Sequence, residues 1–136
     1  MLSELIRVST GGSPAVVDLT DRCTDFLRNC GADQGLLHVF VPHATAGVAI
    51  IETGAGSDHD LLTALDSLLP TDDQWRHRHG SPGHGRDHVL PALVAPYASI
   101  PVLDGRPALG TWHAICLVDP NGDNPDRQVR LSFLPG

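Results

Sequence analysis

The sequence contains no lysine: its nine basic residues are all arginines, against sixteen Asp and Glu, and the formal net charge is −7. The absence of lysine excludes Schiff-base chemistry and the phosphate-binding lysine of a P-loop. The negative charge argues against binding to nucleic acid, because that affinity comes largely from neutralising phosphates with cations. Any anionic ligand must therefore be held by arginine, by histidine or by backbone N–H groups.

Long apolar runs, aromatic residues and paired cysteines are also scarce. No apolar run approaches the roughly 20 residues that a membrane helix needs, and Glu4 and Arg7 interrupt the N-terminal stretch, so we expect no signal peptide and no membrane partner. A cytoplasmic protein is the default expectation. The three cysteines, Cys23, Cys30 and Cys116, form no C-x-x-C motif, and we expect them to be small buried apolar groups.

Short strand-like segments dominate what is present. Apolar and polar residues alternate, or apolar residues run together, in segments separated by turn signals. These segments are "ELIRVST", "AVVDLT", "GLLHVFVPH", "TAGVAIIET", "TWHAICLVD" and "RQVRLSF". The last two are predicted to pair across the turn-rich "PNGDNPD".

Two segments carry helical patterning. We predict a helix over "DRCTDFLRNC", capped by Thr20 or Asp21, and an amphipathic helix over "SDHDLLTALDSLLP", capped by Ser57. The length of 136 residues suits one domain spanning 1–136. The predicted fold class is therefore α+β: a largely antiparallel β-sheet or sandwich, with two principal helices packed on one side, in a single domain.

Half of the eight histidines lie in "HRHGSPGHGRDH", residues 77–88. His77 and His79 share a face if the chain is extended, and His84 and His88 align if it is helical. Neutral imidazole is a common ligand of divalent metals. However, the spacing matches no named zinc motif, and on spacing alone a solvated loop rich in glycine and histidine is the favoured interpretation.

A second candidate is "PHATAGVAIIE", residues 42–52. His43 ends an apolar strand, and the small residues after it would let a ligand approach backbone N–H groups. Thr45 adds a hydroxyl, and Glu52 is one of only two glutamates in the chain. A β-turn with a capping histidine and an edge glutamate is the alternative interpretation.

The last third of the chain contains three further residues to consider for the site, Trp112, His113 and Arg127. In "TWHAICLVD" we expect Trp112 to be a core residue, while the orientation of His113 is left open. Arg127 opens a strand after a turn and could clamp a phosphate, although a surface ion pair is the more usual role.

Taken together, four segments resemble the YjbQ-like family, also called the secondary thiamine-phosphate synthase family, over nearly the whole chain. "PHATAGVAIIE" is similar to the family's H-[ST]-T-[AS]-x-x-x-x-x-E signature, and "IPVLDGRPALGTWHAICLVD" to its I-P-x-x-x-G-x-L-x-L-G-x-W-Q-x-[IV] signature. "GHGRDHVLPAL" occupies the place of the A-H-[IL] segment, and "DRQVRLSF" that of the closing R-x-V strand.

The resemblance implies an α+β fold, a homotrimer, and a histidine-lined site near a subunit boundary that holds a metal in some members. It also implies a weak activity that joins a pyrimidine diphosphate to a thiazole phosphate. The family positions correspond to His43, Thr45, Glu52, His79, His88, Trp112 and Arg127. His84 has no secure counterpart, and His113 stands where the family usually has Gln.

We therefore expect a homotrimer with a phosphorylated small-molecule ligand and a divalent metal, Zn²⁺ or Mg²⁺. By the resemblance, the catalytic residues would be His43, Thr45, Glu52 and Arg127, and the metal ligands His79 and His88. The four-residue spacing from His88 adds His84 as a third metal ligand. Two other functions stay open. One is a metal- or ligand-binding module without turnover, and the other is a metal-assisted hydrolase with Glu52 as base.

Overall fold

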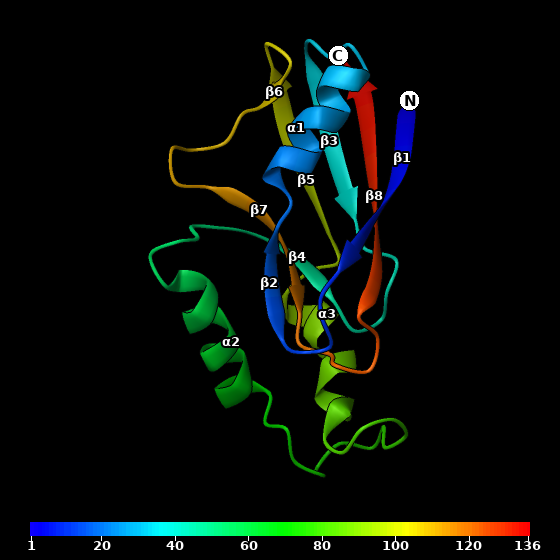
Figure 1. The fold of residues 1–136 in the computed structure, drawn as a ribbon, viewed down its shortest axis with the longest axis vertical. Helices are drawn as coiled ribbons and strands as arrows, with labels where there is room; N and C mark the ends of the chain where they lie inside the picture. Colours follow the sequence, from blue (N-terminus) through cyan, green and yellow to red (C-terminus); the bar gives the residue numbers. More distant parts are fainter.

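Eight strands form two antiparallel sheets in the computed structural model, which describes all residues, Met1–Gly136 (Figure 1). The five-stranded sheet has the order β1(Leu2–Ser9), β8(Asp126–Pro135), β3(Gly35–Phe40), β5(Tyr97–Leu103), β6(Arg106–Pro107). The three-stranded sheet has the order β2(Ala15–Asp18), β7(Ala114–Asp119), β4(Gly47–Ile51). The helical elements are α1(Thr20–Asn29), α2(Ser57–Leu68), the 3₁₀ turn η1(His84–His88) and α3(Leu90–Leu93).

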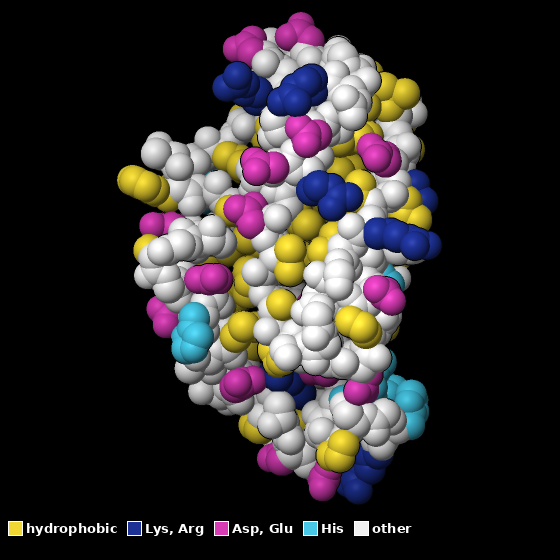
Figure 2. Space-filling view, in the orientation of Figure 1, with side chains coloured by type: hydrophobic (Ala, Val, Ile, Leu, Met, Phe, Trp, Pro, Cys, Tyr) yellow, Lys and Arg dark blue, Asp and Glu magenta, His cyan; other side chains and the backbone are white.

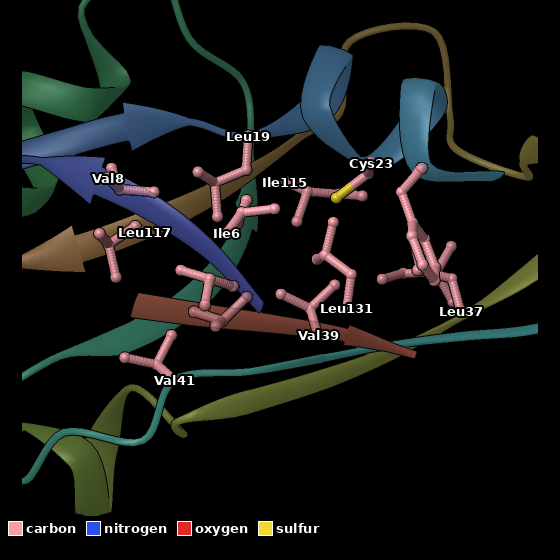
Figure 3. Close-up of a cluster of buried hydrophobic side chains, with 14 of the residues drawn as sticks. Ile6, Val8, Leu19, Cys23, Leu37, Val39, Val41, Ile115, Leu117 and Leu131 are labelled. Carbon is pink, nitrogen blue, oxygen red and sulfur yellow. The ribbon is translucent and has the colours of Figure 1, made fainter. Parts of the chain in front are cut away.

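The core lies between the five-stranded sheet on one side and α1 with the three-stranded sheet on the other (Figure 3). Helix α1 contributes the buried residues Cys23, Phe26 and Leu27 to this core. Helix α2 packs on the outer face of the three-stranded sheet, where Leu65 and Leu69 contact Val118. Both principal helices thus lie on the same side of the five-stranded sheet, and the predicted α+β class is confirmed.

Strand β7 is the innermost element, because all six of its residues are buried. Ile115 and Leu117 point into the main core, whereas Val118 belongs to the smaller cluster under α2. This two-sided burial explains the continuous apolar run in its sequence. The strand ends at Asp119, so the turn that follows starts from a rigid position.

The predicted helix caps are wrong. Thr20 is already helical, and its hydroxyl accepts the N–H of Ile115, while its own N–H donates to Asp18 Oδ1 at 2.9 Å. Ser57 is also the first helical residue, and the residue before it is Gly56 with φ 101°. Tertiary contacts use the hydroxyl of Thr20 that the local pattern assigned to capping.

Burial makes two of the cysteines unreactive. It raises the pKa of the Cys23 and Cys116 thiols to about 12, so both stay protonated near neutral pH. Cys30 is half-buried and free. At 12 residues, α2 is the longest helix, well short of the length needed to cross a bilayer.

Candidate functional site

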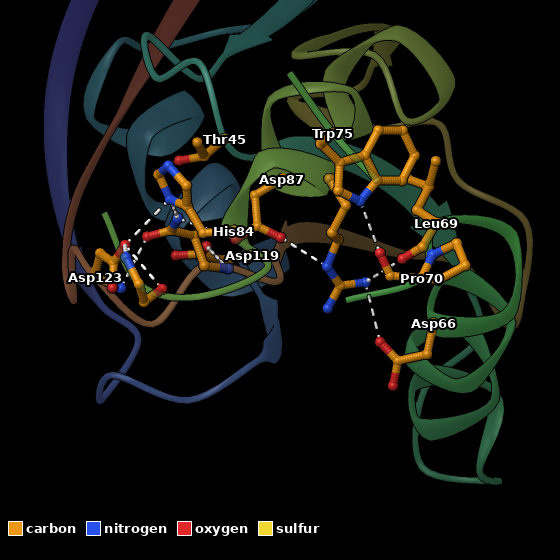
Figure 4. Close-up of polar contacts among 12 residues, drawn as sticks. Thr45, Asp66, Leu69, Pro70, Trp75, His84, Asp87, Asp119 and Asp123 are labelled. Atoms are coloured by element: carbon orange, nitrogen blue, oxygen red, sulfur yellow. Dashed lines mark hydrogen bonds and ion pairs between the residues drawn. The ribbon is translucent and has the colours of Figure 1, made fainter. Parts of the chain in front are cut away.

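The segment between α2 and α3 carries most of the candidate site, and a few polar contacts hold it against the end of α2 (Figure 4). Trp75 Nε1 donates to the carbonyl of Pro70 at 2.8 Å. The buried Arg86 places Nη1 3.0 Å from Asp66 Oδ1 and Nε 2.8 Å from Asp87 Oδ1. The latter is an ion pair too bent to count as a hydrogen bond. Arg86 therefore joins the segment to the end of α2.

Four histidines gather in this segment. The ring of His77 lies between those of His79 and His88, with centroid separations of 4.0 and 3.8 Å. The ring of His84 is 5.1 Å from His77 and 4.9 Å from His88. One ligand atom each from His77, His79 and His84 fall within 4.8 Å of one another. Figure 2 shows histidine atoms reaching the surface near the lower end of the molecule, where this segment lies in Figure 1.

Two of these imidazoles have a buried nitrogen without any hydrogen-bond partner. They are Nε2 of His77 and Nε2 of His84. Burial lowers the pKa of both His77 and His88, and the neighbouring histidines lower the pKa further. His77 and His88 are therefore neutral near pH 7, and each has a lone pair available for a cation.

The side chain of His84 is 9% exposed, and its other nitrogen, Nδ1, has polar neighbours. Nδ1 lies 3.1 Å from Asp123 Oδ2 and 3.3 Å from Asn121 Nδ2. Gly80, with φ 96°, stands beside the ring: a Cβ added there would lie 2.9 Å from His84 Nε2. The open space at this nitrogen therefore depends on a glycine.

A chain of buried polar contacts leads away from the cluster through the β7–β8 turn. Asn121 Nδ2 donates to Asp87 Oδ2 at 3.0 Å, and its backbone N–H donates to Asp119 Oδ1 at 2.9 Å. Arg127 donates to both oxygens of Asp119, at 2.7 and 2.9 Å, and to the Thr45 hydroxyl at 2.9 Å. Burial raises the pKa of Asp87, an effect that Arg86 and the Asn121 hydrogen bond oppose. The histidine cluster and Thr45 thus belong to one connected network.

His43 contacts β8 rather than the four histidines. Its Nε2 accepts the N–H of Gln128 at 2.9 Å, so this nitrogen carries no proton. Burial lowers the pKa of His43, the charge of Arg127 lowers it further, and Asp119 partly offsets this. His43, Arg127 and Arg7 line a groove where β1 ends and β8 begins.

Some of the sequence candidates come together and others do not. His79, His84 and His88 share one cluster, and His43, Thr45 and Arg127 lie around the far end of the buried network. Glu52 is exposed just beyond Ile51, which pairs with Ala114, so it lies at the opposite end of the three-stranded sheet from Asp119. The proposed catalytic roles of these residues stay predictions.

The last third of the chain holds one wrong prediction. Trp112 was expected in the core, but it is 72% exposed on the loop before β7. His113 is exposed on the same loop, and its Nδ1 accepts the N–H of Gly110 at 3.1 Å, away from the cluster.

Sequence reasoning named His77 but did not include it among the metal ligands, and it missed Asn121 and Asp123. The alternation of His77 with His79 was a signal for the first, since both lie on the same face of an extended chain. No local signal pointed to Asn121 or Asp123, because "PNGDNPD" has the composition of any turn.

The geometry describes a small α+β protein of two antiparallel sheets with a histidine-lined candidate metal centre. A family model for UPF0047 protein YjbQ-like matches residues 4–136. The chain therefore belongs to the YjbQ/UPF0047 family, as the sequence motifs indicated.

Relatives and solved structures agree with this assignment. A UPF0047 protein of Mycobacterium bovis is 64% identical over 122 residues, which cover 89% of this chain and 92% of the relative. The UPF0047 protein YugU of Bacillus subtilis is 30% identical, with 86% and 88% covered. A crystal structure of a hypothetical protein from Aeropyrum pernix K1 superposes with a TM-score of 0.91 at 30% identity, over 100% of both chains. These relatives support the family and the fold, and their names state no reaction.

Proposed function

We propose that this chain binds a divalent transition metal at the histidine cluster and uses it to act on a phosphorylated small molecule. The observation that carries the proposal is the pair of buried, unpartnered Nε2 atoms of His77 and His84 within a triad completed by His79. Buried polar atoms in folded proteins are nearly always paired. Two unpaired imidazole nitrogens, in a group of three histidines whose ligand atoms lie within 4.8 Å of one another, are therefore best explained by a cation.

The donor set favours Zn²⁺ over Mg²⁺. Three imidazole ligands suit zinc and other first-row transition metals, whereas Mg²⁺ prefers oxygen ligands. Gly80 supports the same interpretation, because any Cβ at this position would fill the space beside His84 Nε2. When bound, the cation would neutralise negative charge on a phosphate or diphosphate. A chain without lysine and with a net charge of −7 has few other means of doing so.

The reaction we propose for this site is that of a secondary thiamine-phosphate synthase. In this reaction the thiazole nitrogen attacks the methylene carbon of the pyrimidine diphosphate, and pyrophosphate leaves with the bonding electron pair. The protein would supply positioning and charge stabilisation rather than a covalent intermediate. His43, whose Nδ1 is left to carry the proton, and Arg7 line a groove suited to a phosphate group. Arg127 and Thr45 support the wall of that groove through their mutual hydrogen bond.

A titration of the metal-free chain with Zn²⁺, followed by isothermal calorimetry, tests the metal centre. We expect one ion per chain, and we expect His77→Ala and His84→Ala to weaken binding by about 100-fold or more, because each removes a ligand. His59→Ala is the matched control: His59 is exposed on α2, outside the cluster, and its loss should leave affinity unchanged. Equal affinity in all four proteins would contradict the proposal.

The reaction is tested separately with the two thiamine precursors, with and without Zn²⁺. Metal-dependent formation of thiamine phosphate with release of pyrophosphate supports the synthase. Stoichiometric metal uptake without any product would instead indicate a binding module. Metal-dependent release of phosphate from simple phosphoesters, with no coupling of the precursors, would indicate a hydrolase.

We further propose that the functional unit is a homotrimer, as the family resemblance implies. The outward face of the five-stranded sheet supports self-association, because Leu36, Phe40 and Leu134 are each more than a third exposed there. Leu36 and Leu134 pair across β3 and β8, so they form one continuous patch. Such patches on small proteins commonly mark contact surfaces.

A further inference from the structure

We infer that the cavity beside the histidine cluster is a binding site for a phosphoryl group, and that Arg78 is the residue that recognises its negative charge. This inference deepens the proposed function and rests on it for the metal, because the bound cation would supply further positive charge. The site shares no residue with the groove at His43. It is therefore a second place for an anion, beside the candidate metal centre itself.

The first argument is the composition of the cavity wall. The cavity has a volume of about 370 Å³ and is lined by residues of the segment 72–85. Two of the three proposed metal ligands, His77 and His84, line it together with Arg78. Its volume falls within the range of sites for small molecules. A ligand in this cavity would lie beside both the metal-binding imidazoles and the guanidinium.

The second argument is how the Arg78 side chain is held. Its Nε donates to the carbonyl of Trp75 at 3.1 Å. Trp75 is itself fixed, because it packs against the smaller cluster under α2 and its Nε1 donates to the Pro70 carbonyl. This is the one hydrogen bond that the Arg78 side chain makes within the chain, so both Nη groups are left to donate. A guanidinium held in this way offers paired N–H groups to an oxyanion.

The third argument is that no carboxylate pairs with Arg78. The positively charged or chargeable members of the ion pairs in this chain are Arg28, His84, Arg86 and Arg127. Asp72 and Asp73 line the same cavity without forming an ion pair with Arg78, and Asp72 Oδ1 accepts the N–H of Gln74 at 3.2 Å. The charge of Arg78 is therefore available to a ligand.

The charge of the cavity should depend on the metal. In the metal-free chain the two carboxylates of Asp72 and Asp73 outnumber the single guanidinium of Arg78, and this opposes the entry of an anion. A divalent cation on the imidazoles would reverse the balance, because it adds two positive charges to rings that are neutral when they act as ligands. Binding of the anion and binding of the metal should therefore strengthen each other by the same factor.

Three variants of the full chain test this site. Arg78→Met removes the guanidinium and keeps most of the aliphatic side chain. The matched control is Arg76→Met, because Arg76 is also exposed but does not line the cavity. Asp73→Asn removes a negative charge from the wall with little change in shape. Circular dichroism and thermal melting establish that each variant is folded.

The probe is methyl phosphate, titrated into the metal-free and the Zn²⁺-loaded chain and followed by ¹⁵N–¹H correlation NMR. We expect Zn²⁺ to raise its affinity by about 10-fold or more, with amide shifts among residues 72–85. Arg78→Met should lower the affinity by about 10-fold, the loss expected for one hydrogen bond to a charged group. Asp73→Asn should raise the affinity, and Arg76→Met should leave it unchanged. Calorimetry without the probe should show that Arg78→Met keeps the wild-type affinity for Zn²⁺.

The failure of this inference and that of the proposed function are distinguishable. If Zn²⁺ binds but Arg78→Met binds methyl phosphate as tightly as the wild type, the inference is overturned although the metal centre stands. Amide shifts confined to the groove residues Ser9 and Gln128 would also overturn it, because the anion then binds beside His43. If the wild type binds no Zn²⁺, the proposed function fails, and the metal-free titration decides whether Arg78 holds the anion. Equal affinities of wild type and Arg78→Met in that titration would show that it does not.

Discussion

Gly80 shows how one residue can control the candidate site. Its φ of 96° and the contacts that a Cβ would make with His84 argue that any side chain there is both strained and obstructive. We predict that Gly80→Ala abolishes Zn²⁺ binding in calorimetry. Gly54→Ala separates the two effects, because Gly54 has φ 83° and nothing within 4 Å of an added Cβ. Both variants should lose about 1 kcal/mol of stability, but only Gly80→Ala should lose the metal.

At the scale of single residues, His43 makes the stability of the folded chain depend on pH. Its folded pKa lies below the ordinary value of 6.5, because of burial and the nearby Arg127. Between the folded and unfolded pKa values the unfolded chain binds more protons, so the contribution of His43 to stability is present above pH 6.5. It is lost as the pH falls toward the folded pKa.

Two measurements check this prediction. An NMR titration of the His43 ring should give a midpoint below 6.5. Urea denaturation of the wild type should show stability decreasing from pH 7.5 to pH 5.5, and His43→Gln, which keeps an acceptor for Gln128, should reduce that slope. A His43 midpoint above 6.5 would contradict the assignment of Nε2 as an acceptor.

At the scale of elements, the segment between α2 and α3 depends on Arg86 more than on apolar packing. Within residues 70–89 only Gly85, Arg86 and Asp87 are buried, and the arginine joins Asp66, Asp87 and the Leu69 carbonyl. We predict that Arg86→Met speeds amide hydrogen exchange in this segment by about 100-fold or more, since breaking a buried ion pair costs roughly 3–5 kcal/mol.

Exchange measured by mass spectrometry localises this effect. Peptides from β3 and β7 should keep their protection, because the ionic and hydrogen-bonding partners of Arg86 are not members of the main core. Arg28→Met is a suitable control, as the Arg28–Asp25 pair is exposed and contributes little. Uniform loss of protection over the whole chain would show that Arg86 supports the fold rather than the segment.

The positions of helices and strands are the part of the structure that the sequence predicted best. Apolar periodicity located β1, β3, β7 and both principal helices, because burial of one face is a local property of the pattern. The predicted pairing of β7 with β8 is wrong, because β7 lies in the three-stranded sheet and β8 in the five-stranded sheet. The strands β3 and β4, also adjacent in sequence, are divided in the same way, since pairing depends on partners far along the chain. The same limit applies to the site: the histidine segment was recognisable, but the support from Asn121 and Asp123 arises only when a distant turn folds against it.

At the scale of the whole molecule, one large surface is left without cover. The three-stranded sheet and α1 protect one face of the five-stranded sheet, and the other face exposes Leu36, Phe40, Tyr97 and Leu134. Phe40 pairs with Tyr97 on β5, and Leu36 pairs with Leu134 on β8, so exposed apolar pairs join β3 to both of its neighbouring strands. Charge repulsion from a net charge of −7 opposes non-specific association, which leaves a specific assembly as the way to cover this face.

We predict that the chain in solution has three times its 14.5 kDa mass by light scattering. Leu36→Asp and Leu134→Asp should dissociate this assembly, because each places a charge in the apolar patch and would have to be desolvated at the interface. Leu68→Asp is the control: Leu68 is 68% exposed on α2, away from the sheet face, and its substitution should leave the mass unchanged. A monomeric wild type would contradict the proposed trimer. A trimer unaffected by either sheet substitution would show that the subunits contact one another through a different surface.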